Sequence, residues 1–199
     1  MSSRSIEIRR VPSQARGKFK VECLLTAAGA EIAQHGYAGA TMCGIARRAG
    51  AAIGSLYQFY PHKEAIAEVL RERYTVAGAP LWDALREQAP RLSPREVAAG
   101  LVRLVLEINR RCPGFAALLE APRTEGSSRR RSQFRRRIAA VLRARAPRLT
   151  AAGAMHYAAV IQQLLRGLLS LAPAHARAGS LEFQDILARY LEDRIGEVQ

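Results

Sequence analysis

Apolar residues recur every three or four positions along most of the 199-residue chain, and no segment shows the sustained alternation of a strand. The most informative stretch is residues 41–63, in which two short helical patterns flank Gly50. The apolar positions of these patterns are Met42, Ile45 and Ala49, then Ile53, Leu56 and Tyr60. Thr41 suits an N-cap, and a glycine can adopt the positive φ of a tight turn. The stretch predicts a helix-turn-helix, which can place its second helix in the major groove of DNA, although any two short helices joined at a glycine share this pattern.

The segments on either side of this stretch are also helical in pattern. We expect a helix over residues 16–35, ended by Gly36, and a basic arm over residues 1–15 that either stays in solvent or reaches into a minor groove. The basic residues of this arm are Arg4, Arg9 and Arg10. Another helix opens after Pro61, extends as far as Gly78 and leads into a domain boundary at residues 75–80.

The rest of the chain contains further helical patterns, so the predicted fold class is all-α with about nine helices. A polar loop is expected over residues 122–128. The expected helices lie at residues 81–85, from Pro94, from Pro113, around residues 129–142, from Thr150 to Leu171 and over residues 181–195. The expected domains are the arm at residues 1–15, a helix-turn-helix domain at 16–75 and a helical domain at 76–199.

The predicted helix over residues 150–171 is apolar on nearly all sides. Such a helix must bury more than one face, so one face can cover its own core and the other needs a partner. The last predicted helix carries a second apolar stripe. These two helices predict a homodimer interface, with candidate residues Leu164, Leu168, Ile186, Leu187 and Tyr190.

The net charge of +14 favours a polyanionic partner, but its distribution weakens the inference. Residues 1–75 hold 11 Lys/Arg and 6 Asp/Glu, whereas the remaining residues hold 20 and 11. The most basic run is residues 129–137, RRRSQFRRR, which is either a solvated helix face or a contact for DNA or an anionic ligand. Charge alone therefore does not predict sequence-specific binding.

Several classes of protein are disfavoured by what the sequence lacks. It has no uncharged apolar run long enough for a membrane span and no secretory signal, so we expect a cytoplasmic protein without membrane contact. Three scattered cysteines fit a reducing compartment and are expected to be core-filling or surface thiols, with a redox sensor at Cys43 as the alternative. Four histidines show neither metal-ligand nor catalytic-triad spacing, so we expect no catalytic residues, no metal and no cofactor.

Residues 41–65 resemble the N-terminal domain of TetR-family transcriptional regulators. The resemblance is carried by Thr41, IARRAG at 45–50, SLY at 55–57 and PHKEA at 61–65, without a gap. It implies that Thr41 and Lys63 contact phosphate, that Tyr57 touches phosphate or base, and that the remaining contacts lie at the starts of the two helices. Those remaining residues are Met42, Cys43, Ala52, Ile53, Gly54 and Ser55. The order Phe59-Tyr60 departs from the family pattern, which leaves open which ring packs inward.

The resemblance also implies a C-terminal ligand-binding and dimerisation domain, and hence a repressor that leaves a palindromic operator in double-stranded DNA when a small-molecule effector binds. The candidate pocket residues are Trp82, Leu104, Phe115, Phe134, Met155 and Tyr157, for which core packing is the alternative. Few polar side chains lie at the start of the reading helix, so apolar contacts with thymine methyl groups, Ser55 and DNA shape are expected to supply specificity. The alternative function is a helical protein that binds nucleic acid or an anionic surface non-specifically.

Overall fold

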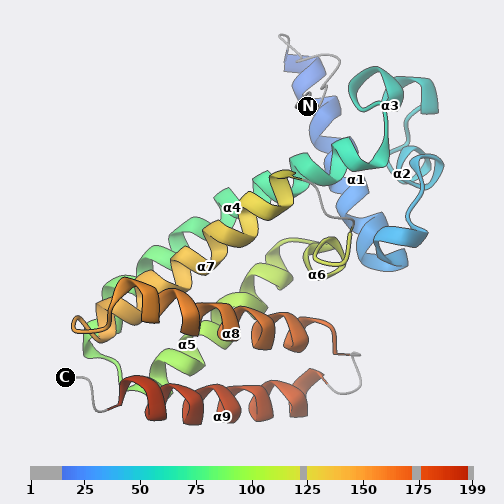
Figure 1. Ribbon diagram of the computed structural model, residues 1–199. Coiled ribbons are helices and arrows are strands. Elements are labelled where there is room, and N and C mark those ends of the chain that lie inside the picture. Colours follow the sequence, from blue (N-terminus) through green and yellow to red (C-terminus); the bar gives the residue numbers. More distant parts are fainter. Residues whose placement is uncertain (1–14, 122–124, 172–175, 197–199) are drawn as a thin grey trace. The chain divides into compact units, whose positions relative to one another are not determined.

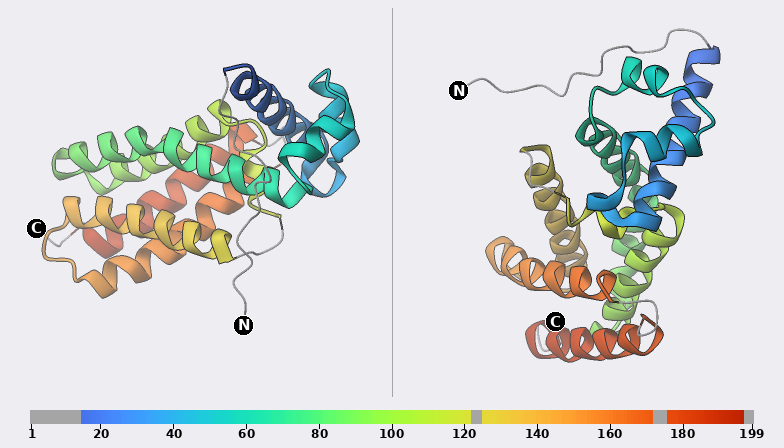
Figure 2. Two further views of the ribbon diagram at one scale, coloured as in Figure 1. Left: turned by 90° about the horizontal axis from the view of Figure 1, so that it is seen from above. Right: turned by 90° about the vertical axis from the view of Figure 1, so that its right-hand side faces the viewer.

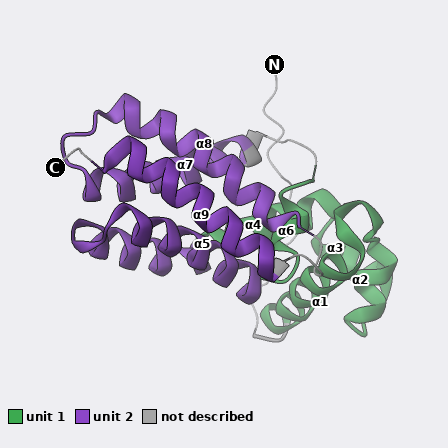
Figure 3. Cartoon of the chain, turned by 90° about the horizontal axis from the view of Figure 1, so that it is seen from below, with its two compact units in different colours: residues 1–75, 112–122 green, residues 76–111, 123–199 purple. Residues whose placement is uncertain are grey.

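The computed structural model describes residues 15–121, 125–171 and 176–196. Within these ranges the chain forms nine α-helices, one short 3-10 helix and no strand (Figure 1), which confirms the all-α fold class. The chain divides into two compact units, residues 1–75 with 112–122 and residues 76–111 with 123–199 (Figure 3). The expected domain limits stay a prediction; by compactness, residues 112–122 group with the N-terminal unit.

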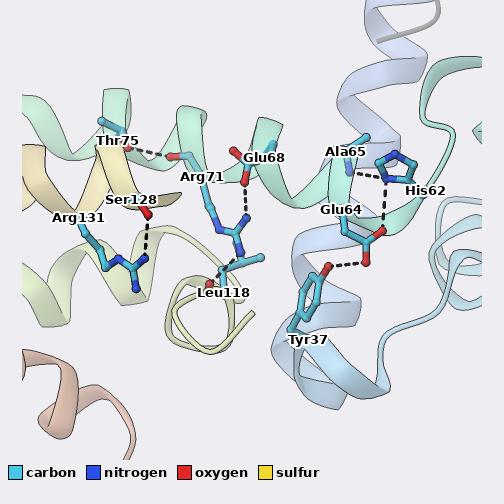
Figure 4. Close-up of polar contacts among 10 residues, drawn as sticks. All are labelled: Tyr37, His62, Glu64, Ala65, Glu68, Arg71, Thr75, Leu118, Ser128 and Arg131. Atoms are coloured by element: carbon cyan, nitrogen blue, oxygen red, sulfur yellow. Dashed lines mark hydrogen bonds and ion pairs between the residues drawn. The ribbon is translucent and has the colours of Figure 1, made fainter. Parts of the chain in front are cut away.

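The N-terminal unit surrounds one apolar core. Its helices are α1 (Ala15–Gly39), α2 (Met42–Arg48), α3 (Ile53–Phe59), the first part of α4 (Lys63–Gln88) and α6 (Phe115–Leu118). The core is built from fully buried side chains on α1 to α4, namely Leu24, Leu25, Ile32, Ile45, Leu56, Ile66 and Leu70. A polar link joins α4 to α6, because the Arg71 guanidinium donates to Glu68 Oε1 at 2.7 Å and to the Leu118 carbonyl at 3.2 Å (Figure 4).

The second unit consists mainly of packed pairs of long helices. Its elements are the rest of α4, the 3-10 helix Ala89–Arg91, α5 (Pro94–Arg111), α7 (Glu125–Arg145), α8 (Ala151–Leu169) and α9 (Ala176–Ile195). Helices α7 and α8 pack together and run in opposite directions, as do α8 and α9 (Figures 1 and 2). Gln162 of α8 joins the first pair by accepting from Arg135 Nε at 3.2 Å and donating to the Arg131 carbonyl at 3.1 Å.

Three element boundaries differ from those expected. Helix α4 does not end near Gly78 but continues through Pro80 to Gln88, and it absorbs the separate helix predicted at residues 81–85. Helix α7 begins at Glu125, so the predicted polar loop is wrong over its last residues. Helix α9 begins at Ala176 rather than at residue 181. The burial of Gly78 against the Ile108 side chain, and of Trp82 and Leu85, explains why packing outweighs the helix-breaking tendency of Pro80.

Candidate nucleic-acid interface

The connection from α1 to α2 is fixed by two backbone features. Gly36 has φ +69° and ψ 170°, a conformation that is essentially confined to glycine, and it interrupts the helical run of α1. Thr41 is extended, and its Oγ1 accepts a hydrogen bond from the Gly44 N–H at 3.0 Å. This is the N-cap expected from the sequence, and it sets the first residue of α2.

A buried carboxylate joins α1 to α2. Glu31 is 3% exposed, and its Oε2 accepts from Arg48 Nε at 3.0 Å. The Arg48 guanidinium also donates to the Gln34 side chain. Gly44 lies directly beside the same carboxylate, because a Cβ at this position would collide with Glu31 Oε1. The pairing with Arg48 offsets the cost of burying the charge, and the glycine allows α2 to approach it.

The turn from α2 to α3 depends on Gly50, whose φ is +61°. No atom lies within 4 Å of the Cβ that another residue would place there, so the requirement for glycine is one of backbone conformation alone. The Ala51 N–H closes the turn by donating to the Ala46 carbonyl at 2.9 Å. Leu56, which is fully buried, then anchors α3 to the core. The helix-turn-helix predicted from residues 41–63 is therefore formed.

Lys63, the first residue of α4, binds the end of α1. Its Nζ donates to the carbonyls of Tyr37, Ala38 and Ala40 at 2.6, 3.2 and 2.8 Å, and lies 4.6 Å from the centre of the Tyr37 ring. An ammonium group has three N–H donors, and all three are used here. No donor remains for a phosphate while these bonds are held, and the charge stabilises the last carbonyls of α1. The phosphate contact expected for Lys63 stays a prediction.

The first turn of α4 is held by a further polar group (Figure 4). The Tyr37 hydroxyl donates to Glu64 Oε1 at 3.0 Å, and burial, with this carboxylate, raises the pKa of Tyr37 to about 12. A backbone hydrogen bond, followed by the Tyr37 hydroxyl, lowers the pKa of Glu64. His62 Nδ1 lies 3.2 Å from the Ala65 backbone nitrogen and 3.3 Å from Glu64 Oε2. Positions 37 and 62–65 thus cap α4.

The structure exposes most of the residues expected to contact DNA. Those exposed are Thr41, Cys43, Ala52, Ile53, Gly54 and Tyr57, while Met42 is half-buried. Ser55 is the exception, because its Oγ is buried and has no hydrogen-bond partner among the described residues. In this conformation the Ser55 hydroxyl faces inward and does not reach bases, so the base contact expected for Ser55 stays a prediction.

The order Phe59-Tyr60 leaves no aromatic ring exposed at these two positions. Phe59 is 8% and Tyr60 3% exposed, so both rings belong to the core. Burial accordingly raises the pKa of Tyr60 to about 12. The departure from the family pattern therefore removes a polar group from the surface without creating an apolar one.

Two exposed polar residues were not singled out from the sequence. Arg47 lies one turn after Cys43 on α2, and Gln58 lies one turn after Gly54 on α3. A spacing of four residues puts each on the same helix face as its predecessor, and this signal could have identified both. Arg47 differs from its neighbour Arg48, which is committed to Glu31.

The candidate pocket residues do not form one group. Trp82 and Phe134 are in contact, with ring centres 5.0 Å apart at an interplanar angle of 86°. Tyr157 instead contacts Tyr190, at 6.1 Å. Phe115 belongs to the N-terminal unit, where its ring lies 6.4 Å from that of Tyr74, so it is removed from the group. Leu104 is 5% exposed and Met155 half-buried, both in the second unit.

The candidate dimer residues divide in the same way. Leu168 is 4% and Leu187 1% exposed, so both belong to the core of their own chain and have little surface left for a partner. Ile186 is 51% exposed, while Leu164 and Tyr190 are half-buried. Val160 of α8, at 37%, is a further exposed apolar residue that the sequence pattern did not separate from its buried neighbours.

Two further observations concern metal binding and membranes. In residues 15–121, 125–171 and 176–196 no group of three His, Cys, Asp or Glu side chains could hold a metal ion. None of the helices in these ranges is both long and apolar enough to cross a membrane. The expected basic arm with Arg4, Arg9 and Arg10 lies outside the described residues.

A capped α2, a glycine turn and a buried polar link from α1 present the outer face of α3 to solvent, and this arrangement defines a helix-turn-helix DNA-binding protein. Residues 24–70 match the sequence model of bacterial regulatory proteins of the tetR family, and residues 93–191 match that of the tetracyclin repressor-like C-terminal domain. The chain belongs to the TetR family of transcriptional regulators.

Solved structures support the same fold. A gamma-butyrolactone receptor (ArpA-like protein) is 17% identical, with a TM-score of 0.57 over 88% of this chain and 99% of that one. TylP, a TetR regulator from Streptomyces fradiae, is 20% identical, with a TM-score of 0.57 over 90% of this chain and 88% of that one. A search of curated proteins finds no match. At these identities the likeness extends to the fold alone.

Proposed function

We propose that the chain is a repressor that binds a palindromic operator as a homodimer and leaves it when a small molecule occupies the second unit. It acts in the cytoplasm and catalyses no reaction. The observation that carries the DNA-binding part is the exposed leading end of α3, held on the N-terminal core by Leu56 and by the turn at Gly50. A dimer explains how so short a helix reaches specificity, because two copies read two half-sites.

The residues at the start of α3 favour apolar readout. Ala52, Ile53 and Gly54 are exposed. The side chains of Ala52 and Ile53 have no polar atom, so they can contact base edges only by apolar packing. The thymine methyl group is the apolar feature of the major groove, so each half-site is expected to carry a thymine opposite Ile53. Thr41 and Tyr57 supply hydroxyl groups to the backbone, and Arg47 supplies charge.

Selection of bound duplexes from a random pool, followed by footprinting, tests this proposal. We expect a discrete palindrome to be protected. Replacing one thymine with uracil removes a single methyl group, and at the position that faces Ile53 we expect a loss of about 4-fold, since a buried methyl contributes about 0.8 kcal/mol. In the Ile53→Ala variant the same replacement is expected to have no effect. Ser55→Ala is the control, because the buried Oγ reads nothing. Uniform binding without a protected site would contradict the proposal.

The dimer has its own test. Ile186 on α9 and Val160 on α8 are exposed on two helices that pack together, and a partner chain would cover them. Ile186→Asp is expected to give a monomer in sedimentation analysis and to lose the palindromic footprint. Leu106→Asp, on α5 at 37% exposure, is the matched control and is expected to remain dimeric.

The effector can be followed through Trp82, the only tryptophan, which packs against Phe134. Compounds that release the operator are expected to change the fluorescence of Trp82. Gamma-butyrolactones are a reasonable first class to screen, because one structural neighbour is described as their receptor. The competing function, non-specific binding of nucleic acid, predicts salt-sensitive binding along the whole duplex and no release by any compound.

A further inference from the structure

Helix α7 carries a line of arginines on its outer face. Arg129, Arg136 and Arg143 are exposed and are spaced by seven residues, which is close to two helical turns. We call these three residues the arginine stripe. The opposite face of α7 is buried, with Ile138 and Leu142 both at 0% exposure. The stripe is thus held in solvent along about 21 Å of helix, because each residue adds about 1.5 Å.

The arginine stripe has few acidic neighbours along the sequence. Residues 126–181 contain eleven arginines and no Asp or Glu, so α8, which packs against α7, offers no carboxylate either. Among the described residues no ion pair involves the stripe. Some exposed arginines elsewhere in the second unit do pair: Arg95 lies 3.4 Å from Asp185, and Arg110 lies 2.7 Å from Glu107. The arginine stripe therefore differs from an ordinary solvated helix face, which carries charges of both signs.

The chemistry around the stripe distinguishes between anionic partners. A protein partner needs apolar or aromatic anchors at the centre of its interface, and a membrane-surface helix needs an apolar face that enters the lipid. None of the large exposed apolar side chains of the described residues lies on α7; those of the second unit are Val76, Leu106, Val160, Leu181 and Ile186. A surface with guanidinium groups and no apolar anchor fits phosphate, which a guanidinium binds through two parallel hydrogen bonds.

We propose that the arginine stripe binds the phosphate backbone of duplex DNA without regard to sequence, as a second contact separate from the helix-turn-helix. Its length of about 21 Å matches about six base-pair steps at 3.4 Å each. This contact supplies affinity for any duplex, whereas α3 supplies the choice of site. It goes beyond the proposed repressor function, which can hold without it.

The test compares the full-length chain with the triple variant Arg129→Ser, Arg136→Ser, Arg143→Ser on a mixed-sequence duplex that lacks the selected palindrome. Affinity is measured from 50 to 200 mM salt. Three phosphate contacts contribute about 2.7 to the slope of log affinity against log salt, so the wild type is expected to lose about 40-fold more affinity across this range than the variant. The palindromic footprint of the variant is expected to keep its boundaries, which separates this result from a failure of the proposed function.

The matched control removes the same charge elsewhere, through Arg103→Ser on α5 with Arg177→Ser and Arg189→Ser on α9, all of them exposed. It is expected to change the slope by less than one. If the salt slope falls equally in the stripe variant and in the control, the effect is due to net charge and the proposal is overturned. An unchanged salt slope in the stripe variant would also overturn it. Loss of binding to vesicles containing one-fifth phosphatidylglycerol, with the DNA slope unchanged, would assign the stripe to a membrane surface instead.

Discussion

Lys63 offers the sharpest test of how the DNA-binding unit is held together. Lys63→Met keeps most of the apolar stem and removes the ammonium group that binds three carbonyls at the end of α1. The two half-buried hydrogen bonds contribute roughly 1 kcal/mol each and the contact with the Tyr37 ring about 0.5 kcal/mol, while the exposed third bond adds little. We expect the free energy of unfolding of the N-terminal unit to fall by about 2–3 kcal/mol.

The assay must follow the correct unit. Trp82 is the only tryptophan and belongs to the second unit, so tryptophan fluorescence does not report on the loss at Lys63. Urea unfolding followed by far-ultraviolet circular dichroism and by tyrosine fluorescence is suitable, because Tyr37, Tyr60 and Tyr74 lie in the N-terminal unit. Lys18→Met removes an equal charge from an exposed position on α1 and is expected to leave the unfolding curve unchanged.

A DNA-binding measurement on the same variant separates the two possible roles of Lys63. If the residue positions the N-cap of α2, Lys63→Met weakens binding while the dependence of affinity on salt keeps its slope. If it neutralises a phosphate, the slope falls by about 0.9. A reduced slope together with an unchanged free energy of unfolding would refute the reasoning.

The remaining predictions concern the same unit. Gly44→Ala is expected to cost about 1–3 kcal/mol in urea unfolding, because the added Cβ collides with Glu31, whereas Gly54→Ala, which meets no atom within 4 Å, is expected to be neutral or slightly stabilising. We expect the free energy of unfolding to fall at high pH, because the pKa values of Tyr60 and Tyr37 are about 12 in the folded chain and about 10 in the unfolded chain. The unfolded state releases these protons first, so stability is fully present below pH 10 and is lost between pH 10 and 12. At pH 11 the loss of stability is about 1.4 kcal/mol for each ring. The Tyr60→Phe variant is expected to lack the part of this loss that comes from Tyr60. Equal stability of the wild type at pH 9 and pH 11 would contradict the prediction.

The sequence was sufficient where a local pattern has one physical explanation. Thr41 predicts an N-cap because a hydroxyl at that position satisfies the first N–H groups of α2, and Gly50 predicts the turn because another residue would be strained. Helix existence followed from apolar spacing, which is strong in α5 and α8. These signals depend only on neighbours along the chain.

The rest depended on contacts between distant residues. Pro80 lies inside α4 because tertiary packing of Trp82 and Leu85 outweighs a local preference, and no local pattern contains that packing. Lys63 has the charge of a phosphate contact, and only the folded chain brings it to the carbonyls of α1. Apolar spacing likewise could not separate the buried Leu187 from the exposed Ile186, because adjacent positions at the edge of an apolar stripe differ by packing alone.

Pro80 has one more consequence. Proline has no N–H, so the carbonyl of Val76 loses its partner within α4, and Val76 is the first residue of the second unit. Helix α4 is therefore unbroken, but it lacks one backbone hydrogen bond where the chain passes from the first unit to the second, between residues 75 and 76. In amide hydrogen exchange, we expect the two halves of α4 to show different opening free energies. Each half should open together with the unit to which it belongs, so the helix should not open as one segment.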